Sequence, residues 1–229
     1  MIEYIKEKSI MDFQVIKVKE DIKEQNDLRS KQLRESLKEK GIYMINVMAS
    51  PGSGKTTLLV NLINRLKNEY NIGVMEADID GDVDAKRISD ETGVKTIQIH
   101  TSGACHLTAQ MVSDAIDEFD VSGLNLLFLE NVGNLVCPAE FDTGSNINMM
   151  LLSVPEGDDK PLKYPLMFEV SKIAVITKID TKKIFDFDVD RCKKNILNRN
   201  PNAKIFEVDA LNDVGVDKLY KYIKELVRF

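Results

Sequence analysis

The 229-residue chain has few cysteines and no long apolar run, and each absence excludes a class of protein. Three cysteines, an odd number, do not make a disulfide framework, so we consider these thiols as metal ligands or core residues. No segment sustains the roughly 18 apolar residues of a membrane span. The N-terminal MIEYIKEKS carries charges where a signal peptide needs an apolar core. We therefore expect a cytoplasmic protein with no membrane association.

The chain also lacks an excess of basic charge. Its 31 lysines and arginines face 37 aspartates and glutamates, which gives a net charge of -6 at pH 7. Such a chain does not present a broad surface for nucleic acid or an anionic membrane, so we expect neither partner. The length suits one sizeable α/β core with an appendage. We expect an arm over residues 1–40 and a body over 41–229.

A glycine-rich turn between an apolar run and a helical pattern is the most informative segment. The sequence from Ile42 to Leu59 reads IYMINVMASPGSGKTTLL. Gly52 and Gly54 lack Cβ atoms, so the backbone can curl its N–H groups around a phosphate chain at the positive end of the following helix. This pattern is typical of a phosphate-binding loop, although Ala49 stands where the strictest form has glycine. The alternative is an ordinary glycine-containing turn, which the strand before it and the helix after it disfavour.

The residues beside these glycines carry nucleotide chemistry. Lys55 can reach the β- and γ-phosphates of a nucleotide, and the Thr56 hydroxyl is placed to ligate Mg²⁺, which prefers oxygen ligands. We therefore predict a nucleotide-binding loop, with Lys55 also catalytic, that consists of Gly52, Ser53, Gly54, Lys55, Thr56 and Thr57.

Short apolar runs alternate with helical patterns along the body. The β-like runs fall at 42–48, 72–77, 124–129, 147–154, 173–177 and 204–208. This alternation predicts an α/β fold of the P-loop NTPase kind, with a mostly parallel sheet and helices on both faces. The charged stretch 13–40, which Gly41 follows as a stop, predicts an N-terminal helical arm. Ligands of such sheets bind beyond the carboxyl ends of the strands, so the residues after each run are candidates for the site.

An acidic residue and a glycine follow the run that ends at residue 129. Glu130 is placed to hold Mg²⁺ through its water shell, and we expect it to be catalytic. The Gly133 amide, with no side chain in the way, can contact a terminal phosphate and let the loop move after hydrolysis. The alternative is that Glu130 is a strand cap or a surface charge.

The sequence Thr177-Lys178-Ile179-Asp180 follows the run at 173–177 and favours guanine. The methylenes of Lys178 can lie along a purine, and Asp180 can accept hydrogen bonds from N1–H and the 2-amino group of guanine. Adenine lacks that donor pair, so GTP is favoured over ATP. The alternative is a solvated turn that carries a lysine and an aspartate by chance.

An acidic cluster follows the run at 72–77, on the same predicted side of the sheet. It consists of Asp78, Asp80, Asp82 and Asp84. A calcium-binding EF-hand is excluded, because Val83 occupies the place of the turn glycine and Ser89 that of the final glutamate. We expect Asp78 and Asp84 to face the nucleotide as catalytic candidates, and a merely solvated acidic loop is the alternative.

A second chemistry lies in Cys105-His106 and in Cys137, because thiolate and imidazole are the ligands that Zn²⁺ and Ni²⁺ prefer. Three ligands do not close a tetrahedron, so either water completes the site or two subunits pool their ligands. Buried, inert cysteines are the alternative. Cys192 and His100 have the character of structural residues, and we assign them no role.

The distance in sequence between the two predicted sites is short. Cys137 lies four residues beyond Gly133. A loop that moves with the γ-phosphate would therefore also move a metal ligand, which couples nucleotide state to metal affinity and the reverse. We expect slow intrinsic hydrolysis, because no arginine finger or positioned glutamine is evident.

From residue 15 to the C-terminus, the chain resembles the hydrogenase nickel-incorporation GTPases of the HypB type. The motifs that carry the resemblance are MASPGSGKTTLL, ADIDGDVDAKRI, GACHLTAQMV, LLFLENVGNLVCPAEFD and SVPEGDDKPLKYP. The resemblance implies a GTPase domain with a metal-binding insert and a GTP-dependent homodimer, which works with hydrogenase maturation proteins to bring nickel to the large subunit of nickel-iron hydrogenase. It also implies that Cys105, His106 and Cys137 are interfacial ligands for Ni²⁺ or Zn²⁺, and that Lys160 acts near the partner's nucleotide.

Some positions depart from the pattern of that family. Thr177 replaces the common asparagine of the guanine motif, and Asp209-Ala210 stands where serine-alanine is usual, so guanine affinity is expected to be tuned differently. The N-terminus has neither a cysteine cluster nor a histidine-rich tract, so we expect no separate nickel store. The alternatives are a urease-type nickel-insertion GTPase, a metal-buffering or sensing protein that uses GTP as a structural ligand, and a small-molecule kinase. Scattered arginines disfavour the kinase.

Overall fold

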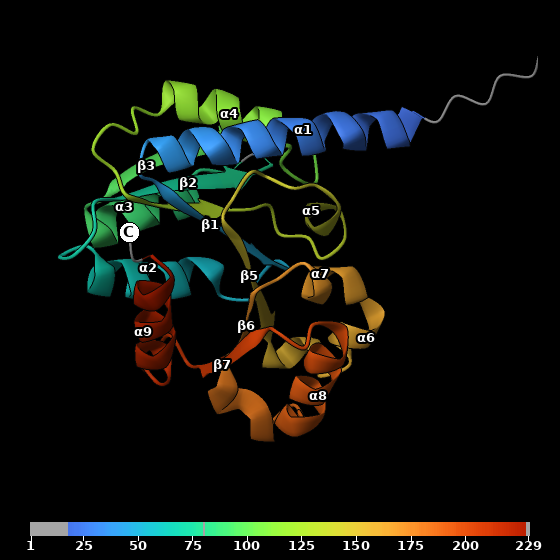
Figure 1. Ribbon diagram of the computed structural model, residues 1–229. Helices are drawn as coiled ribbons and strands as arrows, with labels where there is room; N and C mark the ends of the chain where they lie inside the picture. The colour runs from blue at the N-terminus through green and yellow to red at the C-terminus, as the bar shows by residue number, and fades with distance from the viewer. Residues whose placement is uncertain (1–17, 80, 228–229) are drawn as a thin grey trace, which may run out of the picture.

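The computed structural model describes residues 18–79 and 81–227 (Figure 1). Residues 1–17 of the predicted arm and Asp80 of the acidic cluster lie outside the described residues. In the described part of the chain, seven strands form one sheet, and every neighbouring pair is parallel. The α/β fold with a parallel sheet is therefore confirmed.

The strands lie in the spatial order β3, β2, β4, β1, β5, β6, β7. Their bounds in chain order are β1 Tyr43–Ala49, β2 Ile72–Asp78, β3 Lys95–His100, β4 Leu126–Glu130, β5 Ile147–Ser153, β6 Ile173–Thr177 and β7 Lys204–Val208. The six predicted runs all form strands, and their ends differ from the prediction by at most two residues.

Strand β3 has no counterpart among the predicted runs. It lies at one edge of the sheet, and its side chains are exposed or only half-buried. Its sequence, KTIQIH, alternates polar and apolar residues, whereas strands covered on both faces are apolar throughout. A search for continuous apolar runs therefore passes over this edge strand.

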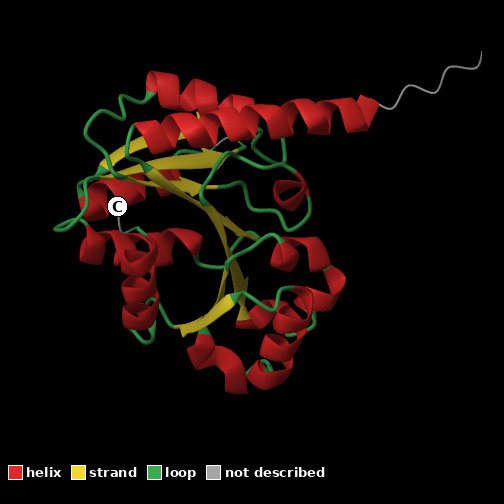
Figure 2. Ribbon diagram, viewed as in Figure 1, coloured by secondary structure: helices red, strands yellow, loops and turns green. Residues whose placement is uncertain are grey.

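Helices cover both faces of the sheet (Figures 1 and 2). The helices are α1 Val18–Glu39, α2 Lys55–Leu66, α3 Val83–Thr92, α4 Ala109–Glu118, α5 Cys137–Glu140, α6 Lys160–Lys163, α7 Pro165–Glu169, α8 Val189–Arg199 and α9 Val216–Leu226. Two short 3₁₀ segments, η1 Val154–Glu156 and η2 Ile179–Lys183, follow β5 and β6. None of the helices in the described ranges has both the length and the apolar character needed to cross a membrane.

Alternation along the central strand β1 divides the core between the two faces. Ile45 and Val47 point to the face that α2, α3 and α9 cover. Met44 packs on the other face with α1 and α4, and Met48 packs there with α7 and α8. Because successive strand residues point to opposite faces, this one short apolar strand contributes side chains to the core on both faces of the sheet.

Helix α1 lies along α4, above the sheet in Figure 1. Leu33 and Leu37 are buried in the core of that face. Asn26 adds polar contacts, because its Nδ2 donates to the Asp142 carbonyl at 2.9 Å and its Oδ1 accepts from the Ala109 amide at 2.8 Å. The described part of the arm is thus held against the body by both apolar and polar contacts.

Candidate functional site

The glycine-rich turn joins β1 to α2 at the carboxyl edge of the sheet. Gly52 and Gly54 have φ angles of +73° and +94°, in the left-handed region where a side chain would be strained. Gly54 is the N-cap of α2 and supplies no side-chain acceptor to the first amides of the helix. These amides and the helix dipole give the turn the features of a binding site for anions such as phosphate.

Side chains from neighbouring segments clamp this turn. The Thr177 hydroxyl, at the end of β6, donates to the Ser53 carbonyl at 2.7 Å. The Lys178 ammonium donates to the Gly52 carbonyl, also at 2.7 Å. The Ser50 hydroxyl donates to the carboxylate of Glu156 in η1. The shape of the turn is therefore set by residues more than 100 positions away in sequence.

Three carboxylates meet behind the turn. Glu130 at the end of β4 is 1% exposed and accepts a hydrogen bond from the Thr56 hydroxyl at 3.1 Å. Glu76 of β2 is the register partner of Glu130, and Asp84 comes from α3. One oxygen from each of these three acids lies within 4.8 Å of the others. The Oε2 atoms of Glu76 and Glu130 are buried with no hydrogen-bond partner among the described residues.

Burial shifts the pKa values of the two glutamates in this group. Burial raises the pKa of Glu76 to about 8, and the Glu130 carboxylate adds to the rise. Burial likewise raises the pKa of Glu130 to about 7, while Lys55 opposes the rise and Asp84 adds to it. Orphaned carboxylate oxygens beside a hydroxyl fit a hard divalent cation such as Mg²⁺, which would favour their ionised forms.

We expect a pH-dependent stability effect from Glu76. Its pKa in the folded protein, about 8, lies above the ordinary value of 4.5, so this carboxyl group lowers the stability of the fold as pH rises between these two values. Glu76→Gln should therefore stabilise the metal-free, nucleotide-free protein at pH 8.5 by about 1 kcal/mol or more, and change little at pH 5. Urea unfolding with a chelator at the two pH values measures this difference. Exposed Glu39→Gln is the control, and an equal effect of Glu76→Gln at both pH values would contradict the expectation.

A cavity of about 290 Å³ opens beside the glycine-rich turn, between the ends of β6 and β7. The lining residues are Ser53, Gly54, Thr57, Thr177, Lys178, Asp180, Thr181, Asp209, Ala210 and Leu211. The side chain of Asp180 is exposed at its rim. Asp209 is 5% exposed and accepts from the amides of Leu211 and Asn212, each at 3.1 Å, so its carboxylate holds its own loop. The structure thus brings the predicted guanine motif to the predicted phosphate loop.

The described aspartates of the acidic cluster after β2 lie in different environments. Asp84 joins the carboxylate group of Glu76 and Glu130. Asp78, at the end of β2, is outside that group but adds to the rise in the pKa of Glu130. Asp82 forms a surface ion pair with Lys86 one helical turn on. Of these three aspartates, only Asp84 belongs to the carboxylate group that contains the predicted metal ligand Glu130.

The two predicted metal cysteines and the histidine come together in the structure. Cys105 and His106 lie in the loop before α4, and Cys137 is the first residue of α5. Their ligand atoms lie within 4.8 Å of one another, and His106 Nδ1 is 3.7 Å from Cys105 Sγ. The Cys137 thiol, together with burial, raises the pKa of Cys105. The His106 ring stacks on Phe141 with centroids 4.0 Å apart. Two thiols and an imidazole at this spacing can hold a borderline metal ion.

The remaining cysteine and histidine differ from this group. Cys192 is fully buried in the core between α7, α8 and the sheet, and burial raises the pKa of its thiol to about 12. A buried, protonated thiol is a poor ligand and a poor nucleophile. His100 is exposed at the end of β3 and does not belong to the metal group.

One short loop joins the phosphate-binding turn to the metal group. A Cβ added to Gly133 would lie 3.0 Å from Cγ and 3.1 Å from N of Pro51, so this backbone rests directly on the glycine-rich turn. The next residue, Asn134, donates through Nδ2 to the Cys105 carbonyl at 3.2 Å. Its Oδ1 accepts from the Val136 amide at 2.9 Å, next to Cys137. The loop therefore touches both sites at once.

Sequence reasoning missed Glu76 and Glu156. Glu76 is an acidic residue inside the apolar strand GVMEAD, and an acid in a strand buried on both faces is itself a sign of function. Glu156 caps η1 and accepts from the Ser153 amide at 2.8 Å while it holds Ser50. Lys160, predicted to act near a partner's nucleotide, begins α6 with its ammonium 5.1 Å from the Tyr164 ring centroid and does not line the 290 Å³ cavity.

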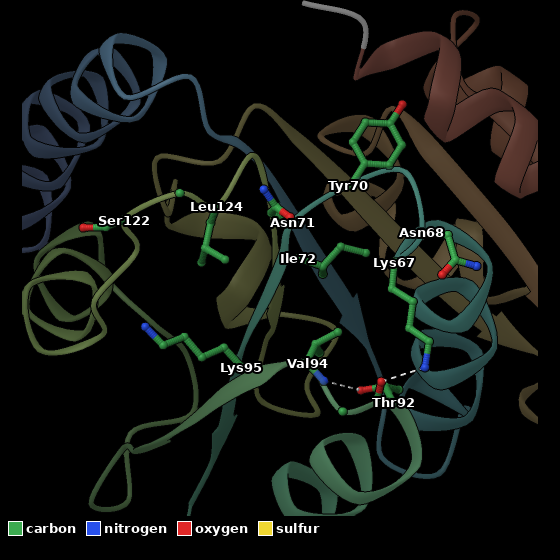
Figure 3. A pocket seen from close by; sticks show the side chains of 12 residues that line it. Lys67, Asn68, Tyr70, Asn71, Ile72, Thr92, Val94, Lys95, Ser122 and Leu124 are labelled. Carbon is green, nitrogen blue, oxygen red and sulfur yellow. Dashed lines mark hydrogen bonds between the residues drawn. The ribbon is translucent and has the colours of Figure 1, made fainter.

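A further cavity, of about 490 Å³, lies at the amino ends of β2 and β3 (Figure 3). The Lys67 ammonium on its wall donates to the Thr92 carbonyl at 2.8 Å, and the Thr92 hydroxyl accepts from the Val94 amide at 3.3 Å. Ligands of parallel sheets bind at the opposite, carboxyl edge. We therefore assign this cavity no role.

The sequence of this chain is similar to a family model and to proteins of known role. Residues 43–207 match the family model described as CobW/HypB/UreG, nucleotide-binding domain. The chain is 41% identical over 210 residues to the hydrogenase maturation factor HypB of Rhizobium leguminosarum bv. viciae, a match that covers 92% of this chain and 70% of that protein. It is 40% identical over 214 residues to the hydrogenase/urease maturation factor HypB of Helicobacter hepaticus, covering 92% of this chain and 87% of the relative.

A solved structure is similar as well. The crystal structure of HypB from Helicobacter pylori in complex with nickel superposes with a TM-score of 0.83 at 38% identity. The match covers 89% of this chain and 95% of the Helicobacter pylori chain.

Proposed function

The chain belongs to the HypB family of hydrogenase maturation factors, and from this premise we propose that it is a GTP-hydrolysing nickel metallochaperone. In this proposal, GTP-dependent dimerisation supports nickel insertion into the large subunit of a nickel-iron hydrogenase. The partners are a second copy of the chain and the other hydrogenase maturation proteins. The observation that carries the proposal is the loop from Glu130 to Cys137, which contacts both the phosphate-binding turn and the metal group.

The phosphate half of the site rests on the turn and its lysine. The backbone from Gly52 to Gly54 surrounds the phosphates, and Lys55 neutralises charge that develops on the γ-phosphoryl group. Thr56 and Glu130 would hold Mg²⁺, and this assignment is supported by the buried Oε2 of Glu130, which has no hydrogen-bond partner in the described part of the chain. A bound Mg²⁺ would supply positive charge that offsets the negative charge of the phosphates.

Hydrolysis also requires a water held in line with the γ-phosphate. Asp84 and Asp78 are our candidates to orient this water, because both lie near Glu130. No arginine among the described residues lines the cavity beside the turn. Slow intrinsic turnover follows, and we infer that dimerisation or a client protein supplies the missing transition-state contacts, with Lys160 reaching the partner's nucleotide.

The base half of the site selects guanine. Asp180 accepts from N1–H and the 2-amino group, and the methylenes of Lys178 cover one face of the purine. ATP would place its unprotonated N1 against the Asp180 carboxylate, acceptor to acceptor. Ala210 and Asp209 complete the wall of the cavity on the side of β7.

The metal half carries nickel as cargo. Cys105, His106 and Cys137 supply three ligands, and a partner copy or water supplies the rest. The Helicobacter pylori relative was solved in complex with nickel, which supports nickel over a purely structural ion. Zn²⁺ prefers the same ligands and is the expected competitor.

The proposal is tested by measuring phosphate release and molecular mass together, with GTP or ATP and with or without Ni²⁺ and Zn²⁺. We expect slow phosphate release from GTP, little from ATP, and a dimer that GTP favours over GDP. We also expect calorimetry to give metal affinities that differ between the GDP-loaded and the GTP-analogue-loaded protein, because the Gly133 loop joins the two sites.

Gly133→Ala tests the proposed coupling between nucleotide state and metal affinity. Its Cβ would press on Pro51, so the loop must shift away from the glycine-rich turn. We expect metal to bind this variant with one affinity in every nucleotide state, while Asn68→Ala, an exposed change beside the cavity at the amino ends of β2 and β3, keeps the difference. Identical nickel affinities for the apo, GDP-loaded and GTP-analogue-loaded wild type would contradict the coupling. GTP binding without any phosphate release would instead favour a buffering or sensing protein.

A urease client is the second candidate. The Helicobacter hepaticus relative is named a hydrogenase/urease maturation factor, so nickel delivered by a protein of this family has two possible destinations. Nickel transfer assays with each apoenzyme would separate the two.

A further inference from the structure

The side chain at the floor of the base cavity has already used its only donor hydrogen. Thr177 ends β6, is 3% exposed, and donates its hydroxyl hydrogen to the Ser53 carbonyl at 2.7 Å. A threonine hydroxyl carries one hydrogen and two lone pairs. Thr177 can therefore offer only an acceptor to a base in the cavity.

The other side-chain donors on the cavity wall are engaged, enclosed or held at the glycine-rich turn. The Thr181 hydroxyl donates its hydrogen to the Lys178 carbonyl at 2.7 Å. The Lys178 ammonium donates one of its three hydrogens to the Gly52 carbonyl, which holds this group at the turn. The Ser53 hydroxyl has no hydrogen-bond partner among the described residues, but Ser53 is 0% exposed, so this hydroxyl is enclosed in the cavity wall and not presented to a base. Thr57, whose hydroxyl accepts from Arg87 at 3.2 Å, belongs to the first turn of α2, where the phosphates bind.

The two ends of the cavity fix how a guanine would lie in it. Asp180 is exposed at the rim, and Thr177 is buried at the floor. A guanine that donates N1–H and its 2-amino group to Asp180 turns its N7 edge inward, toward the end of β6. N7 is an acceptor and requires a donor, whereas the hydroxyl oxygen of Thr177 has only lone pairs to present.

We propose that this chain recognises guanine through the N1–H and 2-amino edge and makes no side-chain hydrogen bond to N7, because Thr177 acts as a clamp on the phosphate-binding turn. The proposal rests on the GTP binding proposed above and specifies which atoms of the base are read. It defines a ligand class: guanine nucleotides altered at N7 bind as well as GTP.

The test compares dissociation constants for GTP and 7-deaza-GTP, in which a C–H group replaces N7, both with Mg²⁺. For the wild type we expect values within about twofold of each other, because no hydrogen bond is lost. Thr177→Asn carries two amide hydrogens, one for the Ser53 carbonyl and one for N7. We expect this variant to bind 7-deaza-GTP about 3- to 10-fold more weakly than GTP, the effect of one hydrogen bond.

Two control variants separate clamping from base contact. Thr177→Val removes the clamp without adding a donor, so both nucleotides should bind more weakly by the same factor. Ser53→Ala removes the enclosed hydroxyl and should leave the ratio of the two dissociation constants unchanged. The wild-type ratio decides the question even if a variant fails to fold.

Selective loss of 7-deaza-GTP binding by the wild type, by more than about fivefold, would overturn this proposal alone. An unchanged ratio in folded Thr177→Asn would overturn the role given to Thr177. Binding of neither nucleotide, or ATP binding as tight as GTP binding, would overturn both this proposal and the guanine site on which it rests.

Discussion

Lys55→Ala should abolish GTP hydrolysis, reducing the rate by at least about 100-fold. Lys55 is the first residue of α2 and follows the two left-handed glycines of the turn. Its loss removes the positive charge proposed to face the γ-phosphate. It also removes the charge that opposes the raised pKa of Glu130, so that carboxyl group becomes still harder to ionise. Single-turnover phosphate release with Mg²⁺ and GTP measures the effect.

The control for this variant is Lys194→Ala, which deletes an equal charge from an exposed position on α8. Its hydrolysis rate should match that of the wild type. Normal turnover by Lys55→Ala would show that the glycine-rich turn does not belong to the hydrolytic site. It would also contradict the proposed GTPase activity.

Cys137→Ala should weaken nickel and zinc binding by at least about 100-fold, because one of three thiolate or imidazole ligands is lost. Nucleotide affinity of the monomer should change by less than about twofold, since Cys137 does not line the cavity beside the turn. Calorimetric titrations with each metal and with GDP measure the two affinities on one protein sample.

Cys192→Ala provides the matched control, because it deletes the same atom type from the buried core. Its metal affinities should equal those of the wild type, although a small cavity will cost about 1 kcal/mol of stability. Equal loss of metal and nucleotide binding in Cys137→Ala would point to a folding defect and would contradict the assignment of Cys137 as a ligand.

Much of this site could be predicted from sequence because its chemistry sits in short, contiguous motifs. The glycines before Lys55 and the pair Cys105-His106 are each readable from neighbouring residues alone. The family resemblance that these motifs carried is confirmed by identities near 40% over most of the chain. The roles of individual residues stay predictions until variants are measured.

Other features could not be read from the sequence, for physical reasons that differ. The edge strand β3 is only half-buried, so it lacks the continuous apolar run of the central strands. Glu76 and Glu130 are 54 positions apart and become neighbours only because β2 pairs with β4 in one register. The contact of Gly133 with Pro51 likewise requires the folded sheet.

By itself, the sequence determined the α/β class and the parallel sheet, and it was enough to predict the phosphate-binding turn and the three candidate metal ligands. Local periodicity and the conformational freedom of glycine act over a few residues, so no tertiary information is needed for these. Only the tertiary structure decided that two buried glutamates and the half-buried Asp84 form one group, that the Thr177 hydroxyl donates its hydrogen to the turn, and that one loop touches both sites. Those facts depend on long-range strand pairing and register, which bring distant residues within a few ångströms and cannot be counted along the chain.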